Sequence, residues 1–132
     1  MYTVLHTESS AGWGGQESRT LHESLGLRKQ GVRAVILCQP GSILGKRADS
    51  EGLEVRTCRM RKNYDLAAIG FILRLIQAEG IDVISTHSGR DRMPTRRYTR
   101  MYAGSSCGVC NTYSAMYGIS GAGTAPATLV QK

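Results

Sequence analysis

The chain has 132 residues, of which 41% are hydrophobic, and a formal net charge of +7. This length suits one domain, or one domain followed by a tail. No apolar run reaches the roughly 18 residues of a membrane-spanning helix, and the first residues lack the basic and apolar regions of a secretory signal. The sequence therefore argues against a membrane-spanning helical protein and a secreted one, and the cytoplasm is the expected location.

The basic charge is concentrated near the end of the chain. Residues 1–91 contain 12 Lys or Arg and 10 Asp or Glu, whereas residues 92–132 contain 5 Lys or Arg and no acidic residue. Apart from Tyr98 and Tyr102, aromatic residues do not alternate with the basic ones, as a surface that stacks on bases would require. Binding to nucleic acid is therefore not expected.

Apolar segments alternate with amphipathic segments over the first two thirds of the chain. Ser42 and Asp65 are typical of helix starts, and Gly31 and Gly80 of helix ends. Alternation with short connections predicts an α/β fold with a Rossmann-like parallel sheet and helices on both faces. The expected strands are 2–7, 32–38, 53–60 and 81–86, and the expected helices are 17–30, 43–50 and 66–79.

A glycine-rich turn, Glu8-Ser-Ser-Ala-Gly-Trp-Gly-Gly-Gln-Glu17, joins the first strand to the first helix. Its glycines, Gly12, Gly14 and Gly15, can adopt positive φ and admit another backbone or a ligand. Amides at the start of the next helix carry partial positive charge. In a parallel sheet this turn lies at the carboxyl edge, where ligands bind. The turn is therefore a candidate phosphate site, although glycines that only permit a tight turn explain the same sequence.

The last third of the chain has neither a helical nor a strand period. We interpret the chain as a Rossmann-like domain over 1–91 and an irregular basic tail over 92–132, which is either disordered or the product of a shifted reading frame. The tail contains Cys107-Gly-Val-Cys110, a single C-x-x-C pair. Zinc normally requires four ligands and no second pair is found, so no metal site is predicted.

Three other groups of polar residues are interpreted as structural. His6 is expected to be a strand residue with a satisfied side chain, and His22 is expected on the surface of the first helix. The basic residues of the 59–62 loop are expected to be solvated. Cys38 and Cys58 fall within apolar strands and are interpreted as small buried hydrophobic residues.

Several motifs resemble the N-terminal domain of retaining GT-B glycosyltransferases of family four. The similarity covers about residues 2–91, and its motifs are Gly12-Trp-Gly-Gly-Gln-Glu17, Leu21-His-Glu, Gln39-Pro-Gly-Ser42, Gly52-Leu-Glu-Val55, Asp65-Leu and Asp82-Val-Ile-Ser-Thr-His87-Ser. The resemblance implies an enzyme of two domains that needs no metal or other cofactor for transfer. The first domain mainly meets the acceptor, and the second mainly holds the nucleotide sugar. No second domain is found in this sequence, so the chain is expected to be a truncated piece that is inactive alone.

The resemblance also implies roles for individual residues. Gly14 and Gly15 would approach the donor phosphates, and His87 would be the catalytic residue near the transferred sugar. Glu17, Arg90 and Asp91 are candidates for acceptor binding, although Glu17 equally suits a helix N-terminus and Arg90 can pair with Asp91. The expected partners are a nucleotide-sugar donor and a carbohydrate or lipid-linked acceptor, with peripheral membrane contact. The alternative is a non-catalytic phosphate- or nucleotide-binding α/β module.

Overall fold

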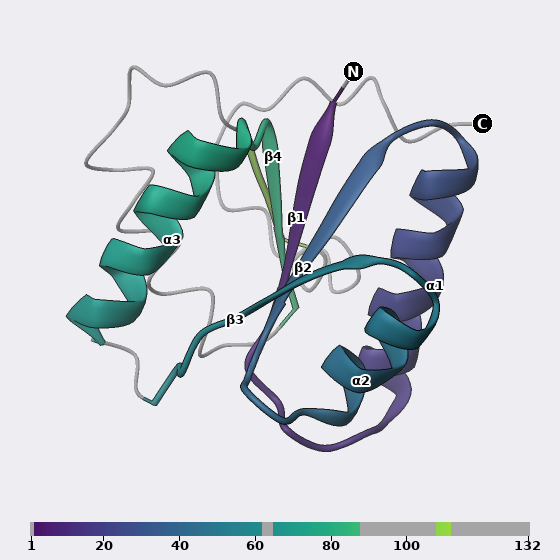
Figure 1. Ribbon diagram of the computed structural model, residues 1–132, viewed down its shortest axis with the longest axis horizontal. Helices are drawn as coiled ribbons and strands as arrows, with labels where there is room; N and C mark the ends of the chain where they lie inside the picture. Colours follow the sequence, from purple (N-terminus) through teal and green to yellow (C-terminus); the bar gives the residue numbers. More distant parts are fainter. Residues whose placement is uncertain (1, 62–64, 88–107, 112–132) are drawn as a thin grey trace.

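The computed structural model describes residues 2–61, 65–87 and 108–111. These residues form a five-stranded parallel sheet in the order β3-β2-β1-β4-β5, with three helices (Figure 1). The elements are β1 (Thr3–Glu8), α1 (Gly15–Lys29), β2 (Arg33–Cys38), α2 (Ile43–Ser50), β3 (Glu54–Thr57), α3 (Leu66–Glu79), β4 (Val83–Thr86) and β5 (Gly108–Asn111). The predicted α/β class with a Rossmann-like parallel sheet is confirmed.

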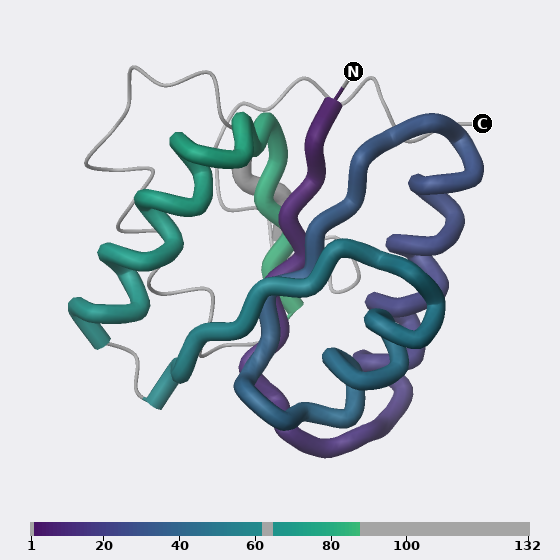
Figure 2. Tube along the Cα trace, viewed as in Figure 1, coloured from purple at the N-terminus to yellow at the C-terminus, as the bar shows by residue number. Residues whose placement is uncertain are grey.

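Helices cover both faces of the sheet. The tube in Figure 2 follows the chain through α1 and α2 on one side, and then past β3 to α3 on the other. Side chains of β2 alternate between two hydrophobic clusters: Val35 and Leu37 pack with residues of α3, whereas Ile36 and Cys38 pack with residues of α1 and α2. A strand covered on both faces needs such a continuous apolar run, which explains why the 32–38 segment was predicted correctly.

The caps of α2 and α3 fix where these helices begin. Asp65 Oδ1 accepts hydrogen bonds from the amides of Ala67 and Ala68 at 3.1 and 3.2 Å. Ser42 Oγ accepts from the Gly45 amide at 3.1 Å. At the end of α3, Gly80 adopts the left-handed conformation with φ of 61°. Both helices therefore have the predicted bounds, because their caps can be recognised in the sequence.

Other elements differ from the prediction. Helix α1 starts at Gly15, two residues before the expected start, and β3 ends at Thr57 rather than at residue 60. Cys58 therefore lies after the strand and is only partly buried, so the prediction of a buried strand residue is wrong for it. Beyond residue 91, where no strand was predicted, β5 pairs with β4. Four residues that include one glycine are too few to show a strand period, so β5 could not be recognised from its residues. The division of the chain at residue 91 stays a prediction.

None of the helices in the described residues is long and apolar enough to cross a bilayer.

Gly45 lies in α2 against the end of β2, where a larger residue does not fit. A Cβ atom at Gly45 would lie 2.9 Å from Cys38 Sγ and 3.1 Å from Ser42 Oγ. We expect Gly45→Ala to lower the free energy of unfolding by about 1–2 kcal/mol, because overpacking outweighs the better helix propensity of alanine. Urea denaturation measures this change.

The same substitution at Gly70 of α3 is the matched control, because a Cβ there meets nothing within 4 Å. Gly70→Ala should raise stability by about 0.5–1 kcal/mol. Adding Cys38→Ala should recover part of the loss caused by Gly45→Ala. Equal effects of the two glycine substitutions would contradict the packing argument.

A network of ion pairs ties α3 to the amino end of the sheet. Arg33 of β2 forms two hydrogen bonds with Glu54 of β3, at 2.8 and 2.6 Å, and also binds the Glu79 carboxylate. Arg56 contacts Glu79 at 2.8 Å. Hydrogen bonds from Arg33 lower the pKa of both Glu54 and Glu79, and Arg56 adds a second hydrogen bond to Glu79.

This network should stabilise the fold less as the pH falls. Because the pKa of Glu79 is lower in the folded protein than its ordinary value of 4.5, its contribution is present above that value and is lost below it. Between pH 6 and pH 3.5, wild type should lose about 1 kcal/mol more stability than Glu79→Gln. Urea denaturation across this range provides the comparison. Glu51→Gln, at an exposed glutamate after α2, should keep the wild-type pH dependence.

Candidate functional site

The strand order reverses between β1 and β4, which are neighbours in the sheet. From β1 the chain continues to β2 and β3 on one side, whereas β4 and β5 lie on the other. In open parallel sheets, ligands bind outside the carboxyl ends of the strands at such a switch point. The glycine turn follows β1 and His87 follows β4. The fold therefore places two of the predicted site segments on either side of the switch point.

Glu8, the last residue of β1, organises the glycine turn. Its side chain is 0% exposed, and it accepts hydrogen bonds from the Ser10 amide at 3.0 Å and from Gln16 Nε2 at 2.5 Å. Ser10 Oγ in turn accepts from the Gly12 amide at 3.2 Å. The carboxylate therefore joins the start of the turn to the first turn of α1. No role was predicted for Glu8, since a carboxylate at the end of a strand is not by itself a functional signal.

Gly14 and Gly15 are exposed at the start of α1. The described glycines with positive φ are Gly31, Gly41, Gly52 and Gly80, so the expectation of positive φ in the glycine turn is wrong. Gly14 is extended, with φ of −157°, and Gly15 is the first helical residue. A Cβ at Gly15 would meet nothing within 4 Å. Gly15 therefore leaves open space beside the first turn of the helix, where backbone amides point out of the helix end.

Glu17 is buried in the first turn of α1 and is 6% exposed. A Cβ built at Gly14 would lie 3.3 Å from Glu17 Oε2, so the carboxylate turns back toward the helix N-terminus. This position agrees with the helix-terminus interpretation, in which the negative charge meets the positive end of the helix dipole. Acceptor binding by Glu17 stays a prediction. The other two acceptor candidates, Arg90 and Asp91, lie outside the described residues.

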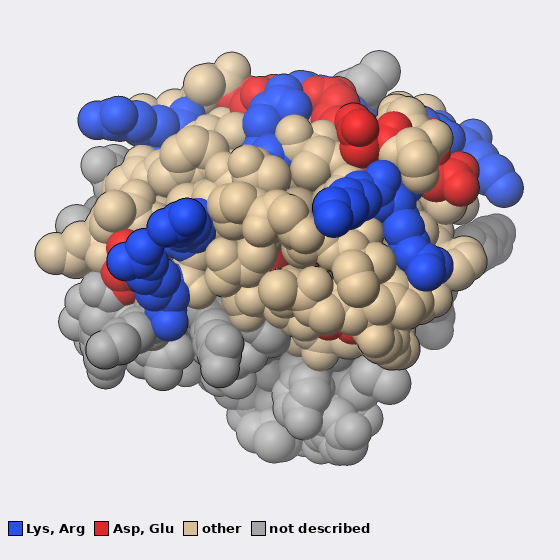
Figure 3. Space-filling view, turned by 60° about the horizontal axis from the view of Figure 1, so that its bottom comes forward, with Lys and Arg blue, Asp and Glu red and all other residues tan. Residues whose placement is uncertain are grey.

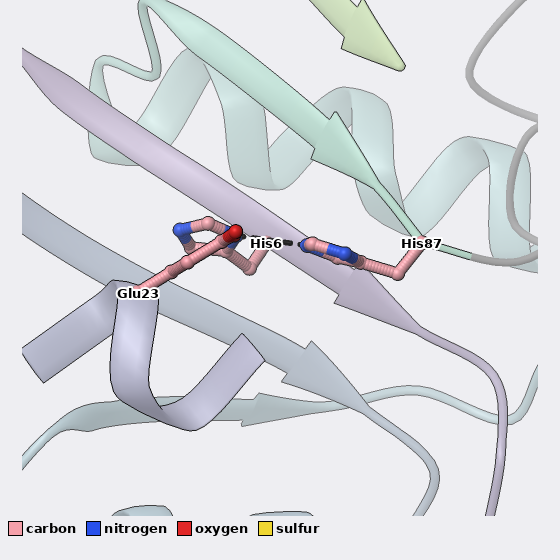
Figure 4. A group of neighbouring side chains, drawn as sticks. All are labelled: His6, Glu23 and His87. Atoms are coloured by element: carbon pink, nitrogen blue, oxygen red, sulfur yellow. Dashed lines mark hydrogen bonds between the residues drawn. The ribbon is translucent and has the colours of Figure 1, made fainter. Parts of the chain in front are cut away.

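His87 is buried beside His6 of β1. The two side chains are 5% and 3% exposed, and His87 Nε2 lies 3.0 Å from His6 Nδ1 (Figure 4). Burial, and then the charge of His87, lowers the pKa of His6 to about 3, so His6 is neutral near pH 7. Its other nitrogen, Nε2, has no hydrogen-bond partner among the described residues. The expectation that His6 is a strand residue is correct, whereas its side chain is satisfied at only one nitrogen.

Glu23 of α1 completes a cluster with the two histidines. Each of the three residues offers one potential ligand atom, and these atoms lie within 4.8 Å of one another. Figure 4 shows the Glu23 side chain reaching from the helix to the His6 ring. Glu23 also accepts a hydrogen bond from Arg19 Nε at 2.7 Å. His6 and Glu23 were not predicted to be site residues. The sheet register, in which His6 pairs with Ser85, brings His6 close to His87, and α1 brings Glu23 to both histidines.

The remaining loops at this edge are held by contacts with each other. Gln39 after β2 donates to the Met60 carbonyl at 2.7 Å and accepts from the Met60 amide at 3.2 Å. Arg47 of α2 lies 4.0 Å above the Trp13 ring.

The basic side chains at this edge do not form one continuous patch in the view of Figure 3. The carboxyl edge comes forward there, and the Lys and Arg side chains of the described residues lie in separate groups around uncharged residues. The exposed Arg59 and Arg61 agree with the predicted solvated loop.

Solved structures share this arrangement of strands and helices. A glycosyltransferase from Rickettsia africae ESF-5 matches with a TM-score of 0.68 and 19% identity, over 88% of this chain and 33% of that one. MurG from Acinetobacter baumannii matches with a TM-score of 0.65 and 14% identity, over 84% of this chain and 34% of that one. The chain shares the fold of about a third of each of these two proteins.

A third match is HepE from Anabaena, solved in complex with UDP and glucose. Its TM-score is 0.63 at 12% identity, over 84% of this chain and 29% of that one. The chain thus spans about a third of the length of these proteins. No protein-family model and no curated protein matches the sequence.

Proposed function

We propose that this chain is the N-terminal, acceptor-side domain of a retaining GT-B glycosyltransferase of family four, and that it works with a second, donor-binding domain outside this sequence. Three findings support the proposal: the motifs of residues 2–91, the shared fold, and a length of about a third of the matched glycosyltransferases. The expected partners are a nucleotide-sugar donor and a carbohydrate or lipid-linked acceptor, with peripheral contact to a membrane from the cytoplasm. Transfer requires no metal or other cofactor.

The start of α1 beside the switch point is the observation that carries the proposal. Gly15 leaves space beside the first turn of the helix, and Glu8 holds the turn that leads into it. Amides at a helix N-terminus bind phosphate through hydrogen bonds and the helix dipole. In this proposal they face the diphosphate of the donor across the cleft between the two domains.

His87 is assigned to the transferred sugar, on the other side of the switch point. Its Nε2 faces His6 in the present arrangement, so the ring must turn out of that contact for Nε2 to reach a sugar. Glu17, Arg90 and Asp91 are assigned to the acceptor. The alternative, a non-catalytic module for a phosphate or nucleotide, uses the same glycine turn but assigns no chemistry to His87.

UDP is a suitable probe for this turn, because HepE was solved with UDP and glucose. We expect weak binding of UDP to the chain, with a Kd near 1 mM, or about −4 kcal/mol. Gly15→Val should abolish it, since the side chain occupies the space before the helix amides. A chemical-shift titration measures affinities in this range.

Gly26→Val is the matched control, because Gly26 also lies in α1 and a Cβ there meets nothing within 4 Å. This variant should titrate like wild type. Equal UDP binding by wild type and Gly15→Val would show that the glycines serve only the turn.

A further inference from the structure

We infer that His6, Glu23 and His87 form a binding site for one divalent transition-metal ion of the zinc type. The site goes beyond the proposed function, which needs no metal for sugar transfer. Its ligands come from three elements that are distant in sequence: β1, α1 and the end of β4. The three residues are not part of a zinc-binding motif of closely spaced residues, so only the fold brings their side chains together.

The spacing of the two imidazoles suits a metal ion. The facing nitrogens, His6 Nδ1 and His87 Nε2, lie 3.0 Å apart. Two ligands at zinc–nitrogen distances of 2.0–2.1 Å are about 3.3 Å apart at the corners of a tetrahedron. The rings therefore need to separate by only a few tenths of an ångström to admit the ion. Each ring then carries its proton on the nitrogen that faces away from the metal.

The chemistry of the three groups also suits zinc. Two imidazoles and one carboxylate are common zinc ligands, and three protein ligands leave a fourth position open. Imidazole binds a metal in its neutral form. The single negative charge of Glu23 offsets part of the charge of the ion. Because His6 and His87 are almost fully buried, the ion has access from the side of Glu23, which is only partly buried.

Arg19 opposes the ion in the present arrangement. Its Nε donates to Glu23 Oε1 at 2.7 Å, so the guanidinium competes with the metal for the same carboxylate and repels it. Removing the charge of Arg19 should therefore tighten metal binding, whereas removing the charge of Glu23 should weaken it. A purely structural role for Glu23 and Arg19 predicts no such opposite effects.

The experiment is a zinc titration of the full chain against a chelating dye, in a Cys107→Ser, Cys110→Ser background that removes the C-x-x-C pair. We expect one bound zinc ion per chain. Glu23→Gln should weaken its affinity about tenfold or more, and Arg19→Gln should strengthen it. His22→Ala is the matched control, because His22 is an exposed histidine of the same helix. Its affinity for zinc should equal that of the parent.

Replacement of zinc by Co²⁺ identifies the ligands, because a site of nitrogen and oxygen ligands lacks the sulfur-to-cobalt charge-transfer band that Cys38 or Cys58 would produce. The inference is overturned if this band appears, if Glu23→Gln binds zinc like the parent, or if no zinc binds at all. Both Glu23 and Arg19 lie at the surface side of α1, so their variants should fold. Zinc binding and UDP binding are measured separately, and each can fail without the other.

Discussion

The chain alone should release no nucleoside diphosphate from any nucleotide sugar. If the proposed function holds, the reaction takes place between two domains, and retaining transfer must stabilise a diphosphate leaving group and a cation-like sugar together. Gly14, Gly15 and His87 form only one wall of such a site. Water then reaches every charge on that wall and screens it. The assay measures diphosphate release from a panel of nucleotide sugars with the purified chain.

A His87→Ala variant is the control for this assay. Turnover that wild type shows and the variant lacks would mean that the chain is a complete enzyme, and the assignment to one half of a site would be wrong. Turnover that persists in the variant would point to a contaminating enzyme. Binding of UDP without turnover is the expected result. Turnover that appears only when a second domain is added would then distinguish a piece of an enzyme from a non-catalytic binding module.

Ile72→Ala should lower the free energy of unfolding by about 3 kcal/mol. Ile72 is 1% exposed and belongs to the hydrophobic cluster between α3 and the sheet, with Leu5, Val35 and Ile84. Removing its side chain leaves a cavity that the surrounding strands cannot close. Since a domain of this size has about 5–15 kcal/mol of stability, the loss should shift the urea midpoint strongly.

Phe71→Ala is the matched control for Ile72→Ala. Phe71 is the preceding residue of α3 and is 39% exposed, so its substitution should cost clearly less. Both variants remove a large apolar side chain from the same helix turn, which leaves burial as the main difference. Equal losses would mean that α3 is not packed on the sheet as described.

The sequence predicted those parts of the fold that depend on local signals. The bounds of α3 follow from an Asp65 cap and a Gly80 stop, and the buried run of β2 follows from its composition. Similarly, the glycine turn was placed correctly at the carboxyl end of β1. The φ angles of its glycines were not, because turn glycines do not reveal which of their allowed conformations is used.

The cluster of His6, Glu23 and His87 could not be predicted in the same way. It depends on β1 lying next to β4 and on the register that pairs His6 with Ser85. Neither the strand order nor the register can be recognised from local patterns in a single sequence. Glu8 was missed for a related reason: its role depends on hydrogen bonds to Ser10 and Gln16, which only the folded turn brings together.

The ion-pair network at the amino end of the sheet has a consequence for self-association. Among the strands that the structure describes, β3 forms one end of the sheet, and an end strand is a template for pairing with other chains. Here the strand has only four residues, and two of them, Glu54 and Arg56, are charged and held in ion pairs. Short, charged end strands resist the addition of a foreign strand. The protein is therefore protected against edge-to-edge aggregation on the side of β3.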